Sequence, residues 1–132
     1  MTTRASLIAA AVTAAAVGGA AVATPHTSST ASAKPSITLT SAKQSGKRIR
    51  LTVSLKNFTL APKQVGGANR PGRGHFHVYV GGRYVVAAAT KTATINPGAL
   101  TVGALYRVRV QLASNGHAPI GAKSNVITIR WK

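Results

Sequence analysis

The amino-acid sequence predicts an all-β fold, an antiparallel β-sandwich, for the part of the chain that follows residue 34. Apolar and polar side chains alternate in several short segments, and this period of two is typical of half-buried strands. Glycine, proline and asparagine turn signals separate the segments. No helical period occurs after residue 34, so the three observations agree on an all-β domain.

The N-terminal segment predicts a cleaved signal peptide. Arg4 supplies a positive charge, residues 7–23 form an apolar run, and Ala21-Val22-Ala23 is a small-x-small cleavage site. The alternative is a transmembrane anchor. The run is rich in alanine, is broken by two glycines and falls short of the roughly 20 residues of a membrane span, which favours the signal peptide.

The sequence thus predicts three segments: a signal peptide over residues 1–23, a flexible lead-in over residues 24–34, and one β-sandwich domain over residues 35–132. A second small-x-small site ends at Ala33, so cleavage after Ala23 and cleavage after Ala33 are both open. With the signal peptide removed we expect no transmembrane span, and an extracellular protein that is secreted or associated with the cell surface.

The first half of the domain contains the clearest strand. Residues 36–42 can form the first strand and residues 44–47 a turn. Residues 48–56 then alternate strictly between polar and apolar. This alternation directs four apolar side chains to the inner face, Ile49, Leu51, Val53 and Leu55.

The second half continues the same pattern. Gly81-Gly82 joins strands over residues 75–80 and 83–88, because paired glycines supply the positive φ of a two-residue hairpin. About seven short strands without an internal repeat favour an immunoglobulin-like sandwich, with a small barrel as the alternative. The remaining predicted strands cover residues 91–95, 105–113 and 125–131.

Residues 59–74 form the one long irregular connection that the sequence predicts. This connection carries Lys63, Arg70 and Arg73 among glycines and prolines. Loops of this length are usually functional or disordered. An anion-binding loop and a solvated flexible loop are therefore both open.

The charge balance predicts an anionic partner and excludes most catalytic chemistry. The sequence has 17 lysines and arginines and no aspartate or glutamate, a formal net charge of +17. A field of this sign attracts anionic polymers and surfaces, although it also serves solubility. Without carboxylate side chains or cysteine there is no Ser-His-Asp triad, glycosidase pair, calcium or magnesium site, thiol nucleophile or disulfide. We therefore expect a protein without enzymatic activity.

Basic side chains on the predicted sheet form a candidate anion-binding face. Arg107 and Arg109 point outward from a strand that should neighbour the strand of Tyr79. Together with Arg70 and Arg73 of the long connection, they can hold phosphate, carboxylate or sulfate. Aromatic residues are scarce and no RNA-recognition or oligonucleotide-barrel signature occurs, so we expect no sequence-specific nucleic-acid binding.

Three histidines form a candidate metal site that competes with this anion-binding face. His75 and His77 share one side of a strand, about 6.5–7 Å apart. His117 lies in the turn before the last predicted strand, and the third and sixth strands of an immunoglobulin-like domain pair, which brings that turn near one end of the histidine strand. Three imidazoles without a carboxylate suit copper or zinc and do not suit calcium or magnesium.

Three stretches, "GHFHVYVGG", "YRVRVQLASNGHAPI" and "SNVITIRW", together resemble a known group of proteins. They are similar to bacterial exported immunoglobulin-like β-sandwich domains of unknown function, whose pattern is a GHxHxYxxG strand and a later NxHxP turn. The resemblance covers roughly residues 74–131 and implies an exported sandwich with a connection to metals, copper among them, at His75, His77 and His117. Gly81 and Gly116 stand where that pattern prefers Asp, so acidic partners that orient imidazoles are missing.

Two hypotheses of function follow. The first is an exported binding module, without enzymatic activity or cofactor, whose cationic face engages anionic polymers or cell-envelope surfaces. The alternative is an extracellular copper- or zinc-binding protein that uses the three histidines. The sequence leaves the oligomeric state open.

Overall fold

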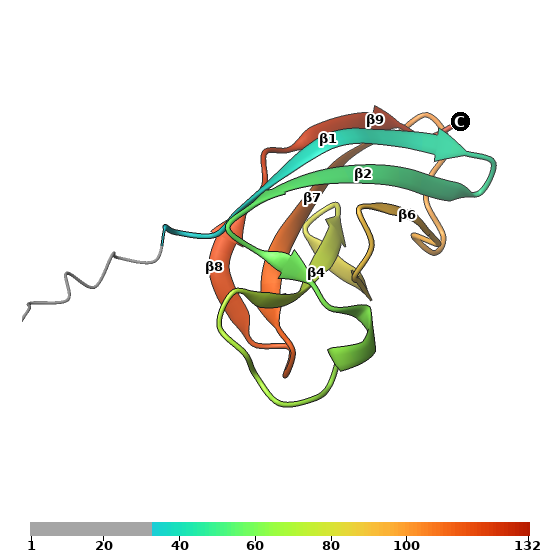
Figure 1. Cartoon of the computed structure of the whole chain (residues 1–132). Coiled ribbons are helices and arrows are strands. Elements are labelled where there is room, and N and C mark those ends of the chain that lie inside the picture. Colours follow the sequence, from blue (N-terminus) through green and yellow to red (C-terminus); the bar gives the residue numbers. More distant parts are fainter. Residues whose placement is uncertain (1–32) are drawn as a thin grey trace, which may run out of the picture. The chain divides into compact units, whose positions relative to one another are not determined.

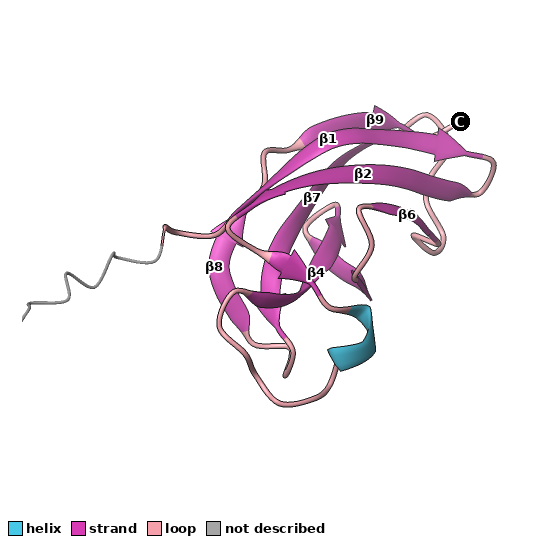
Figure 2. Ribbon diagram, in the orientation of Figure 1, coloured by secondary structure: helices cyan, strands magenta, loops and turns pink. Residues whose placement is uncertain are grey.

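The computed structural model describes residues 33–132, and this part of the chain is built from strands with one short 3-10 helix (Figures 1 and 2). The predicted all-β class is confirmed. The predicted signal peptide and nearly all of the lead-in lie outside the described residues. The elements are β1 (Ser36–Ser45), β2 (Arg48–Lys56), β3 (Thr59–Leu60), η1 (Pro62–Gln64), β4 (Arg73–Val80), β5 (Arg83–Ala88), β6 (Thr92–Ile95), β7 (Leu105–Ser114), β8 (Pro119–Lys123) and β9 (Ile127–Arg130).

The strands form two sheets. The first sheet has the order β1-β2-β6, and both of its pairings are antiparallel. The second sheet is centred on β4 and β7, which pair antiparallel. Strand β4 also pairs with β5 and, at its first two residues, in parallel with β3, while β7 pairs with β8 and β9 along different parts of its length. No helix in the described part of the chain is long and apolar enough to cross a membrane.

Each predicted strand has an observed counterpart, but two observed strands were not expected. Strand β3 has only two residues and pairs over that length, which is too short to leave an alternating pattern. Strand β8 contains Pro119 and Gly121, residues that are typical of turns, and it pairs only with the far part of β7 across a register shift. A proline fits at this position because it begins a strand at the edge of a sheet.

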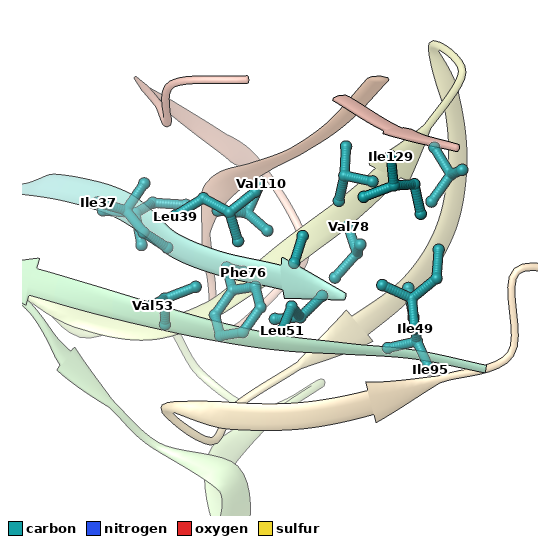
Figure 3. Close-up of a cluster of buried hydrophobic side chains, with 14 of the residues drawn as sticks. Ile37, Leu39, Ile49, Leu51, Val53, Phe76, Val78, Ile95, Val110 and Ile129 are labelled. Atoms are coloured by element: carbon teal, nitrogen blue, oxygen red, sulfur yellow. The ribbon is translucent and has the colours of Figure 1, made fainter. Parts of the chain in front are cut away.

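The core lies between the two sheets (Figure 3). The prediction for β2 is confirmed, because Ile49, Leu51 and Val53 are buried and Leu55 is partly buried. Trp131 is also buried, in the same cluster. The other labelled members in Figure 3 are Ile37, Leu39, Phe76, Val78, Ile95, Val110 and Ile129.

The long connection is more structured than the sequence predicts. It contains β3 and η1, and its last part, residues 65–72, runs beside the turn between β7 and β8 (Figure 1). The amide of Gly66 donates to the carbonyl of Asn115 at 2.7 Å. The side-chain amide of Asn115, which is fully buried, donates to the carbonyl of Ala68 at 2.8 Å. Four intervening strands separate the two segments in sequence, so local pattern alone does not disclose this packing.

Replacing Leu51 by Ala should lower the free energy of unfolding by about 2–5 kcal/mol, because the side chain is fully buried and leaves a cavity. Urea unfolding followed by tryptophan fluorescence measures this loss. Ser54→Ala on the exposed face of the same strand is the matched control, and we expect a change within about 0.5 kcal/mol. Equal losses in the two variants would contradict the assignment of the inner face.

Candidate metal-binding site

Strand β4 carries two histidines on the face opposite the core. Its alternation directs Phe76 and Val78 inward, so His75 and His77 lie on the outer face of the second sheet. Both histidines are nevertheless buried, with 0% and 9% of their surfaces exposed. Gly74 precedes them, and a Cβ atom at that position would overlap the carbonyl oxygen of Ala113 on β7. Glycine therefore allows the close approach of β4 and β7 that sets this site.

The turn between β7 and β8 supplies the third histidine. The amide of His117 donates to the carbonyl of Ser114 at 2.9 Å, and the amide of Ser114 donates to the carbonyl of Ala118 at 2.9 Å. His117 has a φ of 66°, in the left-handed region that glycine usually occupies at such a position in a hairpin loop. A side chain other than glycine costs about 1–2 kcal/mol in this conformation. Strain of this kind is concentrated at functional sites.

The neighbouring loop fixes this turn from the other side. Besides the two bonds of Asn115, the amide of Gly116 donates to Oδ1 of Asn69 at 2.7 Å. These bonds join the turn to the 65–72 segment, so the position of His117 depends on the long connection. Sequence reasoning missed the roles of Asn69 and Asn115, and the only signal was that each stands in a turn-forming stretch.

The three imidazoles converge on one point. Nε2 of His75 lies 3.1 Å from Nε2 of His77 and 3.1 Å from Nδ1 of His117. One nitrogen of each ring belongs to a set whose members all lie within 4.8 Å of one another. Two ligands of a tetrahedral zinc ion lie about 3.3 Å apart, given zinc–nitrogen bonds of about 2.0–2.1 Å. The spacing observed around His75 is close to this value.

A hydrogen-bond network alone satisfies this arrangement poorly. A ring nitrogen carries either one proton or one lone pair. Nε2 of His75 therefore forms one well-directed hydrogen bond, yet it faces two other ring nitrogens at the same distance. A cation that accepts all three lone pairs removes this conflict.

Burial keeps the imidazoles of His75 and His77 neutral, which is the form that binds metal. Burial is the main cause that lowers the pKa of His75 from 6.5 to about 4, with further contributions from His117 and His77. The pKa of His77 is also lowered, first by burial and then by His117. At neutral pH the lone pairs of these two rings are therefore free to coordinate.

The other ring nitrogen of His75 is not oriented by a hydrogen bond. Its Nδ1 atom is buried and has no hydrogen-bond partner among residues 33–132. Histidine ligands usually donate this proton to a carboxylate or a carbonyl. The sequence predicts that this hydrogen-bond acceptor is absent, since acidic partners are missing. Packing against the neighbouring rings orients His75 instead. These rings are His77, at a centroid distance of 5.0 Å, and His117, at 4.5 Å.

The residues of the predicted anion-binding face fall at two ends of β4. Tyr79 pairs with Arg109, whose guanidinium carbon lies 4.5 Å from the ring centroid of Tyr79. Arg107 and Arg109 also line a cavity of about 360 Å³ at the Gly81-Gly82 turn. Arg70 and Arg73 lie before the histidines, at the other end of the strand. The binding of anionic polymers stays a prediction from charge.

No family model, curated protein or solved structure matches the chain. The resemblance to exported immunoglobulin-like domains therefore stays a prediction, and the case for a function depends on the three histidines.

The metal-free protein should lose stability on acidification within one pH window. Because the folded-state pKa of His75, about 4, lies below its ordinary value of 6.5, the unfolded chain binds more protons between these values. The free energy of unfolding should thus fall as the pH drops from 6.5 to 4. Urea unfolding at a series of pH values in a chelator measures this profile.

The absence of aspartate and glutamate makes this test unusually clean, because no carboxylate side chain titrates in the same window. His75→Gln is the matched control. It keeps a neutral polar group at the site, and the acid-induced loss should become smaller. A profile of the unsubstituted protein that stays flat down to pH 4 would show that His75 is not buried in its neutral form.

Proposed function

We propose that this protein binds a divalent transition metal, Cu(II) or Zn(II), through His75, His77 and His117. The observation that carries the proposal is the convergence of three ring nitrogens, with Nε2 of His75 3.1 Å from both of the others. Two of the three rings are buried and held neutral, while His117 is exposed. The cluster is therefore exposed to solvent at His117, on the side of the β7–β8 turn.

The donor set selects among metals. Imidazole suits copper, zinc, iron and nickel, whereas calcium and magnesium require oxygen ligands that this cluster lacks. Soft ligands for Cu(I) are also missing, because the sequence has no cysteine and its one methionine is Met1. At a site of nitrogen ligands, Cu(II) has a higher affinity than Zn(II) and the other divalent metals of the first transition row. We expect Cu(II) to bind more tightly in direct competition.

We propose binding in an exported immunoglobulin-like domain, without catalysis. The sheet orders β1-β2-β6 and β5-β4-β7-β9 support this fold, since they match strands A-B-E and C′-C-F-G of immunoglobulin domains. Three ligands leave a coordination position open, as in catalytic zinc sites. However, the sequence has no carboxylate that can act as general base or orient an imidazole, and this supports a role in binding.

Metal should stabilise the folded protein. At a free metal concentration 100 times the dissociation constant, we expect the free energy of unfolding to rise by about 2.7 kcal/mol. Thermal unfolding of residues 33–132 with and without Cu(II) or Zn(II) measures the rise, and added chelator should reverse it. His77→Ala should abolish the shift. An unchanged melting temperature with both metals would contradict the proposed function.

Replacing His117 by Gly should separate stability from binding. Glycine relieves the left-handed backbone, so the metal-free variant should gain about 0.5–1 kcal/mol in its free energy of unfolding. The same change removes one ligand, so the metal-dependent stabilisation should fall sharply. Denaturant unfolding in chelator and in metal measures both effects.

Asn57→Gly is the matched control for this variant, because Asn57 also has a left-handed φ, 55°, but contributes no ring to the cluster. Asparagine tolerates this conformation and Nδ2 of Asn57 donates to the carbonyl of Lys34, so we expect only a small change in stability in both conditions and an unchanged metal effect. If His117→Gly still binds metal as the unsubstituted protein does, His117 is not a ligand.

A further inference from the structure

A metal in the three-histidine site would carry an uncompensated charge. Neutral imidazoles contribute no negative charge, so a divalent ion bound by them keeps its charge of +2. Most metal sites balance part of this charge with a carboxylate or a thiolate. This sequence contains no aspartate, glutamate or cysteine that could do so. No side chain of this protein can therefore supply the compensating negative charge.

The burial of the site strengthens this requirement. His75 is fully buried and His77 is 9% exposed, so one side of the ion would face protein rather than water. A charge that is partly removed from water costs free energy unless an opposite charge accompanies it. His117, the exposed member, marks the side on which a further ligand can approach.

The residues around the histidines add positive charge. On the outer face of the sheet, His77 pairs with Gln111, and the next pair along the strands is Tyr79 with Arg109. Gln111 also pairs with Lys123 of β8, which is exposed. The backbone of Lys123 thus lies two strands away from that of His77, at about 10 Å given a strand spacing of 4.7–4.9 Å. Over such a distance charges still act on one another at moderate salt.

We propose that the site binds its metal together with a small oxyanion, a carboxylate or a phosphate, which occupies the open coordination position. This inference rests on the proposed function and names the co-ligand of that same site. The oxyanion replaces water on the ion, and no covalent bond is broken and no electron is transferred. Arg109 and Lys123 raise the affinity for the anion through their charge, while the three imidazoles hold the ion.

The test is a titration of the Cu(II)-loaded protein in sodium perchlorate, whose anion coordinates weakly. Sodium formate is added in one series and inorganic phosphate in another, at constant ionic strength. We expect a saturable change in the copper d–d absorption and in the electron paramagnetic resonance spectrum. The series that saturates at the lower concentration identifies the class of anion. Metal-free protein should show no saturable change in its histidine ring resonances with either anion.

The double variant Arg109→Gln with Lys123→Gln should weaken anion binding by about fivefold, because two charges at roughly 10 Å are lost. Its copper affinity in perchlorate should not decrease. Lys47→Gln with Arg48→Gln is the matched control, since it removes the same charge at the β1–β2 turn, and anion binding should stay the same. Equal anion affinities in the two double variants would overturn the role of Arg109 and Lys123.

The copper titration distinguishes a failure of oxyanion binding from a failure of metal binding. Copper that binds in perchlorate but gives no spectral change with formate or phosphate would overturn the oxyanion and leave the metal site standing. A failure of Cu(II) to bind in any medium would overturn both.

Discussion

The pairing of β4 with β7 is the interaction on which the rest of this structure depends. It aligns Phe76 with Leu112 and Val78 with Val110 on the inner face, so the same register that builds the core also sets the outer face. On that outer face the pairing places the two histidines of β4 beside the C-terminal end of β7. His117 lies in the turn that follows this end. A slip of one residue would move the histidines into the core and the apolar residues into solvent. The register of β4 with β7 therefore determines both the core on one face of the sheet and the candidate site on the other.

The histidine cluster is costly for the metal-free protein. Two imidazoles are buried with lowered pKa values, Nδ1 of His75 lacks a partner within the described residues, and His117 has a left-handed backbone. Each feature lowers stability, and none is required by a β-sandwich. Conflicts of this kind between local preference and fold are expected at functional sites. Together they favour a ligand at this cluster over a purely structural role, because a bound cation would offset several of these costs at once.

The lack of acidic residues also shapes how the fold is stabilised. No side-chain ion pair is possible in this sequence, and amide side chains link distant segments. Asn125 accepts from the amide of Leu39 and donates to its carbonyl, and Gln44 does the same with Lys132. Asn115 joins the β7–β8 turn to the long connection. These bonds are neutral, so salt should affect the folded domain mainly through repulsion among its cations.

The sequence by itself determined the all-β class, the inner face of β2 and the identity of the three candidate ligands. A period of two is a local property, and turn residues mark the ends of strands without reference to the rest of the chain. Only the tertiary structure decided that the long connection packs on the β7–β8 turn, that β8 forms, and that His117 lies 3.1 Å from a residue 42 positions earlier. Those features depend on contacts between segments far apart in sequence, and such contacts form only after the sheets pair and the core excludes water.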